Sequence, residues 1–129
     1  MIVVDTSVWI DYLNSVSTPQ TETLDLLLGR DVLAIGDLIL TEILQGLRPD
    51  AQFSRVKQVL LSFVVFEMFG VLRAIRCADR YRTLRKKGIT IRRTVDVIIA
   101  SYCIDEGHTL LFSDKDFIPF VEHFGLKTI

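Results

Sequence analysis

Four acidic residues of this chain stand at the edge of an apolar segment or inside one. They are Asp5 after the apolar opening of the chain, Glu42 within residues 38–44, Asp96 within residues 95–99, and Asp114 after residues 110–112. Apolar segments pack into a core, where a carboxylate without a partner is costly to bury. A shared polar site explains these positions better than surface decoration does. We therefore expect the four carboxylates to converge.

Converging carboxylates point to a hard divalent cation. Two of them about 6 Å apart repel by roughly 3 kcal/mol in a protein-like dielectric, so without a cation at least one must be protonated. Mg²⁺ or Mn²⁺ removes that repulsion, because both prefer carboxylate and water oxygens. No histidine or cysteine stands at a spacing that suits zinc. Asp116 is a candidate auxiliary ligand. Mg²⁺ held by carboxylates and waters is typical of phosphoryl chemistry.

Most of these acids also have a purely structural explanation. Asp5 and Asp114 could cap the turns that follow them, and Asp96 could be a favourable acid in the first turn of a helix. Asp116 could be a solvated helix acid. Glu42 has no such role, because it interrupts an apolar helix. One common site accounts for the acids more simply than separate coincidences.

Short apolar segments alternate with helical patterns along the chain, which predicts an α/β fold. Strands are expected at residues 2–4, 32–35, 63–66, 109–112 and 126–129, and helices at residues 7–13, 19–28, 37–46, 50–61, 71–87, 95–106 and 115–123. Asp37 and Thr94 are expected to cap two helices, and Gly88 and Gly107 to end two. Such an alternation forms a parallel sheet covered on both faces, with ligands beyond the carboxyl ends of the strands. The acids after the first and fourth strands stand at those ends.

Composition indicates one folded domain over residues 1–129. Half of the residues are hydrophobic and 24% are charged, which excludes a disordered chain. No apolar run reaches the roughly 18 residues of a membrane span, and the N-terminus lacks the basic region of a signal peptide. Cys77 and Cys103 make no metal-ligand spacing and are expected to be reduced core thiols of a cytoplasmic protein.

Four stretches of the sequence carry a family resemblance. They are Val4-Asp5-Thr6-Ser7-Val8-Trp9-Ile10, Thr41-Glu42-Ile43 with Gly46, Asp96-Val97-Ile98-Ile99-Ala100, and Leu110-Leu111-Phe112-Ser113-Asp114-Lys115-Asp116-Phe117. These stretches occur in the family's order and span nearly the whole chain. With them the chain resembles PIN-domain ribonucleases, most closely the VapC-type toxins of bacterial and archaeal toxin–antitoxin modules. The resemblance implies a PIN-like α/β/α sandwich with a central parallel sheet of about five short strands.

The resemblance also implies an activity and partners. The activity is that of an Mg²⁺- or Mn²⁺-dependent endoribonuclease whose acidic quartet is Asp5, Glu42, Asp96 and Asp114. The three aspartates would hold the metal, directly or through water, and Glu42 would bind a metal or orient the attacking water. The implied assembly is a homodimer, inhibited by a cognate VapB-type antitoxin that places a segment in or near the active-site groove.

Two departures from the family pattern stand out. Phe112 occupies a position where many relatives carry a threonine, so a role for that hydroxyl passes to Thr6 or Ser113, or is absent. Residues 98–101 read Ile-Ile-Ala-Ser where Leu-Ile-Ala-Ala is commoner, which looks like variation in the core.

Positive charge is concentrated in one segment of the chain. From Arg73 to Arg93 there are nine basic residues and a single acid, Asp79, so the segment carries +8 and the rest of the chain −9, for a net charge of −1. The segment could follow RNA phosphates, or it could be a solvated helix face and a charged turn. The candidate RNA contacts are Arg85, Lys86, Arg92 and Arg93.

Three other functions compete with this interpretation. A catalytically silent PIN scaffold is disfavoured by the intact quartet. A phosphoacceptor receiver-like domain would have an adjacent acidic pair after its first strand, where this chain has Asp5 alone. Cleavage by His108 and His123 has no local motif to support it. The aromatic residues Trp9, Tyr12, Tyr81 and Tyr102 are expected to pack, with interface contacts or base stacking as alternatives.

Overall fold

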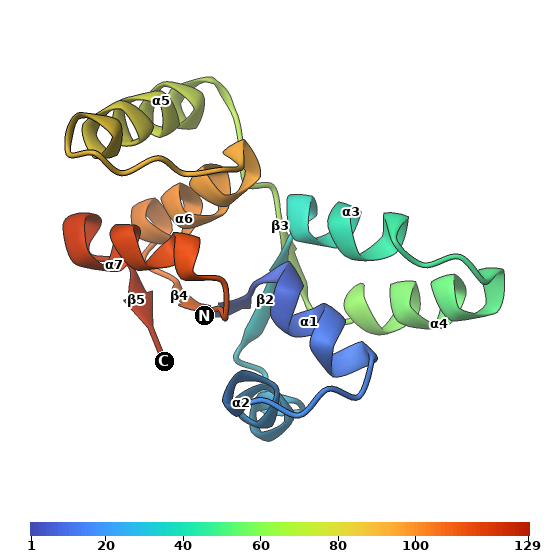
Figure 1. The fold of residues 1–129 in the computed structure, drawn as a ribbon. Coiled ribbons are helices and arrows are strands. Elements are labelled where there is room, and N and C mark those ends of the chain that lie inside the picture. The colour runs from blue at the N-terminus through green and yellow to red at the C-terminus, as the bar shows by residue number, and fades with distance from the viewer.

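A wholly parallel five-stranded sheet forms the centre of the protein (Figure 1). The computed structural model describes residues 1–129. The strands are β1 (Ile2–Val4), β2 (Leu33–Gly36), β3 (Val64–Phe66), β4 (Thr109–Leu111) and β5 (Lys127–Thr128), in the order β3-β2-β1-β4-β5. The central strand β1 pairs with β2 and β4. Val3 and Val4 are fully buried, as expected for a strand covered on both faces.

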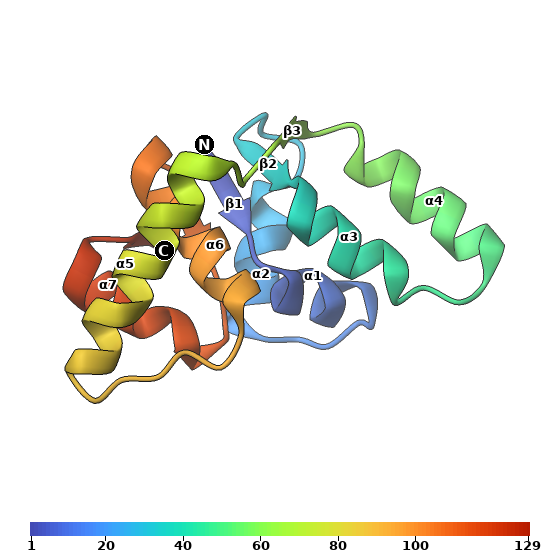
Figure 2. The ribbon, with the colours of Figure 1, turned by 90° about the horizontal axis from the view of Figure 1, so that it is seen from above.

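Seven α-helices flank the sheet. They are α1 (Thr6–Leu13), α2 (Pro19–Leu27), α3 (Asp37–Gln45), α4 (Asp50–Leu60), α5 (Val71–Lys86), α6 (Thr94–Glu106) and α7 (Ile118–Phe124). Figures 1 and 2 both show α5, α6 and α7 grouped on one side of the molecule and α3 and α4 on the other. No helix has both the length and the apolar character needed to cross a membrane.

The hydrophobic core is continuous, and α6 is buried within it. It contains 27 buried hydrophobic residues drawn from both sides of the sheet. Every residue of α6 from Asp96 to Cys103 is buried, so this helix lies in the core along most of its length. The thiols of Cys77 and Cys103 are both free and buried. The first turn of α6, which carries Asp96, is therefore held firmly in position.

The predicted α/β fold with a parallel sheet of five short strands is confirmed. All but one of the predicted elements match the structure to within one residue at each end. Gly107 ends α6 in a left-handed conformation with φ of 73°, and Gly88 follows α5 with φ of 81°. Glycine adopts these angles at no steric cost, which is why the sequence signalled both helix ends correctly.

Three local expectations were wrong. Residues 115–123 do not form one helix: a 3₁₀ turn (Lys115–Phe117) precedes α7, whose first turn contains Pro119. The predicted caps Asp37 and Thr94 are instead the first helical residues, after Gly36 and Arg93. The Asp37 carboxylate accepts from the backbone N–H groups of Leu38 (2.9 Å) and Met68 (3.1 Å), so it ties α3 to the chain between β3 and α5. This tertiary contact is invisible in the local sequence.

Candidate metal centre

Two paired strands bring the first and last acids of the quartet to the same edge of the sheet. Val4 of β1 lies opposite Leu111 of β4, and the backbone N–H of Asp5 donates to the carbonyl oxygen of Leu111 at 2.9 Å. Asp5 and Asp114 are the N-caps of α1 and of the 3₁₀ turn. The structural role of these acids is therefore real, but each cap uses only one carboxylate oxygen.

Asp5 is the acid with the most constrained surroundings. Its side chain is buried, and its Oδ2 accepts from the hydroxyl of Ser7 at 2.7 Å and from the backbone N–H of Ser7 at 3.3 Å. Its Oδ1 is buried without a hydrogen-bond partner. Burial raises the pKa of Asp5 to about 6, and the negative charge of Asp96 adds to that effect, although the bonds from Ser7 oppose it.

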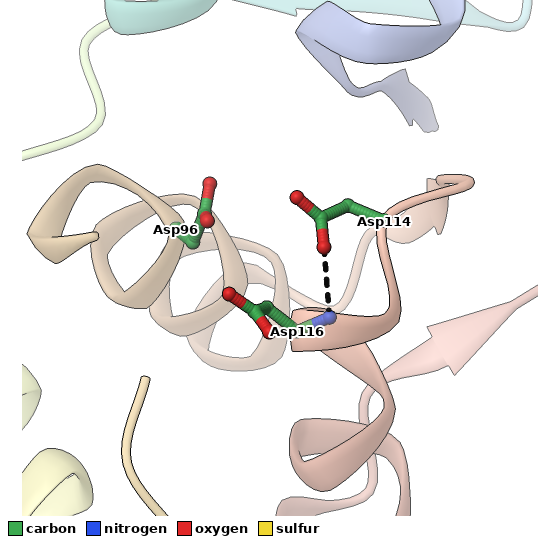
Figure 3. Close-up of side chains that lie close together, drawn as sticks. All are labelled: Asp96, Asp114 and Asp116. Carbon is green, nitrogen blue, oxygen red and sulfur yellow. Dashed lines mark hydrogen bonds between the residues drawn. The ribbon is translucent and has the colours of Figure 1, made fainter. Parts of the chain in front are cut away.

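Three aspartates form the tightest acidic group of the protein. Asp96, Asp114 and Asp116 each offer a carboxylate oxygen, and these oxygens lie within 4.8 Å of one another. Figure 3 shows the three side chains approaching one another from the start of α6 and from the turn after β4, with the backbone N–H of Asp116 donating to Asp114 at 2.9 Å. The structure thus brings together the predicted auxiliary acid and two members of the quartet.

Glu42 reaches the same region from α3 but lies outside the closest group. Its Oε1 accepts from the hydroxyl of Thr6 at 2.7 Å, and its Oε2 lies 3.7 Å from Nη1 of Arg93. The negative charges of Glu42 and Asp114 both raise the pKa of Asp96, though less than its burial does, and Arg93 opposes the rise. The quartet is therefore electrostatically coupled.

Two adjacent arginines partner the acids. Arg93 donates from Nε and Nη2 to the two oxygens of Asp96, at 3.2 and 3.0 Å. Arg92 donates from Nε to Asp116 at 2.9 Å, and its Nη2 lies 3.7 Å from Asp114. The sequence predicted both as RNA contacts, whereas the structure places both guanidinium groups against the acidic centre.

Each hydroxyl nominated from the sequence has a definite neighbour. The Thr6 hydroxyl orients Glu42, whereas the exposed Ser113 hydroxyl lies 3.3 Å from that of Ser7 and bonds no carboxylate itself. Phe112 packs against the ring of Phe117, with ring centroids 5.2 Å apart. Sequence reasoning missed Ser7. The signal was its position two residues after a capping aspartate, where a hydroxyl can reach back to the carboxylate.

The remaining basic residues divide into two groups. Arg73, Arg76 and Arg80 on α5 all contact Asp105 on α6, at distances from 2.6 to 3.4 Å, so they hold the two helices together. The second group lies at the end of α5 or just after it and is exposed to solvent: Arg82, Arg85, Lys86 and Lys87. Only the second group is free to meet a nucleic acid without breaking the fold.

The other chemical candidates lie away from the acids or serve packing. His108 precedes β4 at the end of the strand opposite to the acids, where it packs against Tyr102 and Phe66. Trp9 is buried and packs against Phe63, and the hydroxyl of Tyr12 bonds Asp25 at 2.7 Å. A mechanism that uses His108 at the acidic centre is therefore inconsistent with this fold.

The donor set suits a hard divalent cation. All the candidate ligands are carboxylate oxygens, which Mg²⁺ and Mn²⁺ prefer. The oxygen of Asp5 that is buried without a partner would be satisfied by a cation at this edge of the sheet. Asp5, Asp96, Asp114 and Asp116 are thus the residues that could hold the metal, and Glu42 stands beside them.

Comparison with known proteins identifies relatives over nearly the full length of the chain. Residues 2–120 match the sequence model of the PIN domain. The VapC ribonuclease Mb1587 of Mycobacterium bovis is 26% identical over 119 residues, which is 91% of this chain and 89% of that protein. Ribonuclease VapC11 of Mycobacterium tuberculosis matches with the same identity and coverage.

Solved structures share the fold. The structure of VapBC2 from Rickettsia felis, bound to a DNA fragment from its promoter, superposes with a TM-score of 0.73 at 24% identity. The match covers 100% of this chain and 98% of that chain. The VapBC-1 structure from nontypeable Haemophilus influenzae gives a TM-score of 0.75 at 21% identity, with coverage of 100% and 97%.

Proposed function

The chain belongs to the PIN domain family, and from this membership we propose that it is a metal-dependent endoribonuclease, the toxin of a toxin–antitoxin module. The observation that carries the proposal is the group of carboxylate oxygens within 4.8 Å of one another, contributed by the first turn of α6 and the turn after β4. The relatives named as ribonucleases support RNA as the substrate, because they align with 91% of this chain. Such a site suits hydrolysis of phosphodiester bonds.

Mg²⁺ or Mn²⁺ is the proposed cofactor. Asp5, Asp96 and Asp114 would hold it, directly or through water, with Asp116 as an auxiliary ligand. When bound, the cation supplies positive charge to the scissile phosphate and makes the attacking water more acidic. Ser7 fixes the rotation of the Asp5 carboxylate and so directs its second oxygen.

Glu42 and the basic side chains complete the proposed catalytic groups. The hydrogen bond from Thr6 holds Glu42 in one orientation, in which its carboxylate can orient the attacking water and take a proton from it. Arg92 and Arg93 are next to the acids and would meet the phosphates that flank the cleaved bond. Arg85 and Lys86 would contact RNA farther from the cut.

We further infer the partners and the compartment. The solved relatives are VapBC complexes that match this chain over its whole length, which supports a VapB-type antitoxin as the inhibitor. A homodimer in the cytoplasm is the assembly that the resemblance implies.

The test is cleavage of total RNA by the antitoxin-free protein. We expect cleavage with Mg²⁺ or Mn²⁺, loss of cleavage in EDTA, and a decrease of about 100-fold in Asp96→Asn, because that substitution weakens a buried ligand. Asp25→Asn is the matched control, since it removes the same charge from a surface carboxylate that bonds only Tyr12. Cleavage that survives both EDTA and Asp96→Asn would contradict the proposal.

A catalytically silent PIN scaffold is the second candidate. The exposed Arg92 and the half-exposed Arg93, which already neutralise acids of the centre, are the observation in its favour. Metal binding without cleavage of any RNA would support the scaffold. A receiver-like phosphoacceptor domain is set aside, because the chain matches the PIN domain over residues 2–120.

A further inference from the structure

Arg93 already acts as a cation within the acidic centre. Its Nε and Nη2 donate to both oxygens of Asp96, and its Nη1 lies 3.7 Å from Glu42. The Asp96 side chain is fully buried, whereas the Arg93 side chain is 51% exposed, so the guanidinium group lies between the carboxylate and solvent. A bidentate arginine–carboxylate pair of this kind is among the strongest ionic contacts in proteins.

The oxygens that Arg93 uses are also needed for metal binding. Both oxygens of Asp96 accept from Arg93, yet Asp96 belongs to the group of carboxylates within 4.8 Å that could hold a divalent cation. A guanidinium group and a divalent cation on one carboxylate repel each other. Metal binding therefore requires at least one of the two hydrogen bonds from Arg93 to Asp96 to break.

The chain allows Arg93 to move without disturbing the helix. Arg93 is the N-cap residue of α6, with extended backbone angles of −125° and 129°, and its side chain makes no cap hydrogen bond. A long side chain at such a position can swing outward by rotation about its own bonds. Asp96 stays in place, because α6 is buried from Asp96 to Cys103.

We propose that Arg93 is an exchangeable counter-cation of this centre. It neutralises Asp96 and Glu42 in the metal-free protein, is displaced when the metal binds, and then presents its guanidinium group to an RNA phosphate. This inference rests on the proposed nuclease function. The contact between Arg93 and RNA was already expected from the sequence, and the new element is the exchange of Arg93 between the acids and the phosphate. Arg92 differs, because its contacts are with Asp114 and Asp116 and its side chain is 74% exposed.

The first measurement is the affinity for Mn²⁺, obtained by calorimetry on the full chain. We expect Arg93→Gln to bind Mn²⁺ about fivefold more tightly than the wild type, because no guanidinium group competes for Asp96. In EDTA the same variant should unfold at a lower temperature, because Asp96 is left buried without a counter-charge. Arg93→Lys should give an intermediate affinity, since it keeps the charge but loses the two-pronged bond, and it also serves if Arg93→Gln does not fold.

Arg30→Gln is the control for net charge. It removes one positive charge from an exposed arginine in the connection after α2, so its affinity for Mn²⁺ should equal that of the wild type. The second measurement is RNA cleavage at saturating Mn²⁺. There Arg93→Gln should show a KM about fivefold higher, because a phosphate contact is missing. A purely structural role for Arg93 would not make Mn²⁺ binding tighter while it raises the KM for RNA.

The outcomes separate this inference from the nuclease proposal. Equal or weaker Mn²⁺ binding by Arg93→Gln, with RNA still cleaved by the wild type, overturns the exchange and leaves the nuclease intact. An unchanged KM overturns the phosphate contact. If neither the wild type nor Arg93→Gln binds Mn²⁺, the metal-dependent nuclease itself is wrong. If the wild type cleaves no RNA but Arg93→Gln still binds Mn²⁺ more tightly than the wild type does, the exchange at the metal site is supported and the nuclease proposal is not.

Discussion

At the scale of single residues, Ser7 is the side chain that orients the buried carboxylate of Asp5. Its hydroxyl holds one oxygen of Asp5 at 2.7 Å and leaves the other without a protein partner. We expect Ser7→Ala to lower both the affinity for Mn²⁺ and the rate of RNA cleavage by about tenfold, because a supporting hydrogen bond to a ligand is lost. Calorimetry and initial rates measure the two effects.

Ser113→Ala is the comparison for Ser7→Ala. The Ser113 hydroxyl lies 3.3 Å from that of Ser7 but bonds no carboxylate. Ser113→Ala should therefore lower the Mn²⁺ affinity and the cleavage rate less than Ser7→Ala does. If Ser113→Ala proves as damaging as Ser7→Ala, the Ser113 hydroxyl is itself a functional group, as the departure at Phe112 allowed.

The residue types of the site were readable from the sequence, but their pairings were not. An acid inside an apolar segment, such as Asp96 or Glu42, signals a carboxylate held near the core, and Asp96 is buried while Glu42 is partly buried. The direction of a basic side chain carries no such signal. Arg92 and Arg93 were therefore predicted as contacts for RNA. In the folded chain Arg92 pairs with Asp114 and Asp116 from the turn after β4, and Arg93 pairs with Asp96 one turn on in α6 and lies near Glu42 of α3.

At the scale of elements, α5 is held to α6 largely by charge. Only two of its residues, Cys77 and Leu84, are buried. The carboxylate of Asp105 on α6 forms ion pairs with Arg73, Arg76 and Arg80 of α5. We expect Asp105→Asn to lower the free energy of unfolding by about 2 kcal/mol at pH 7, because charge-assisted bonds are lost and Arg80 is left without its partner. Urea unfolding measures this difference.

Glu106→Gln is the matched control on the same helix end. Glu106 accepts from Arg73 at 2.7 Å, but its side chain is 50% exposed, so the cost should stay below about 1 kcal/mol. Equal losses in the two variants would contradict the special role of Asp105.

The effect of Asp105→Asn should also depend on pH. Burial alone would raise the pKa of Asp105, but the bonds and charges of Arg80, Arg73 and Arg76 outweigh burial and lower it. The ionised carboxylate therefore adds stability above the ordinary pKa of about 4, and this stability is lost as pH falls through the lowered value. The difference between wild type and Asp105→Asn should be constant from pH 7 to about pH 5 and shrink below about pH 4.

Element types followed from the sequence, whereas some element ends did not. Alternation of short apolar strands with amphipathic segments is a local pattern, and it placed the strands and all but the last helix to within one residue. The caps at Asp37 and Thr94 failed because a cap depends on what the side chain meets in the fold. Asp37 meets the backbone of Met68, which is distant in sequence.

At the scale of the whole molecule, one exposed apolar face is the surface that we propose for the second copy of the homodimer. Val71, Leu72 and Ile75 at the start of α5 are each more than half exposed, and Phe69 is 49% exposed. Arg76 and Glu106, of opposite charge, line the same surface hollow as Phe69 and Leu72. A face that carries both charges beside an apolar patch can complement itself across a twofold axis.

We therefore expect Leu72→Asp to weaken the proposed homodimer by at least about tenfold, because a charge would be buried against the apolar face of the partner copy. Sedimentation equilibrium of the antitoxin-free protein measures the dissociation constant. Leu26→Asp is the control, since Leu26 is 67% exposed on α2, a different helix. A dimer that tolerates Leu72→Asp uses another face.

The acidic centre is divided along the chain, and this division sets the order in which the protein becomes active. Asp5 and Glu42 are made early, whereas Asp96, Asp114 and Asp116 are made late, and β1 finds its partner β4 only after most of the chain exists. Under the proposed function, a ribosome that makes this chain therefore works beside a nascent chain that cannot yet cleave RNA. Cleavage begins only when the late segment has emerged and paired with β1. A product released too early by a translation error lacks Asp96, Asp114 and Asp116, three of the five acids, and under the proposed function it would be inactive.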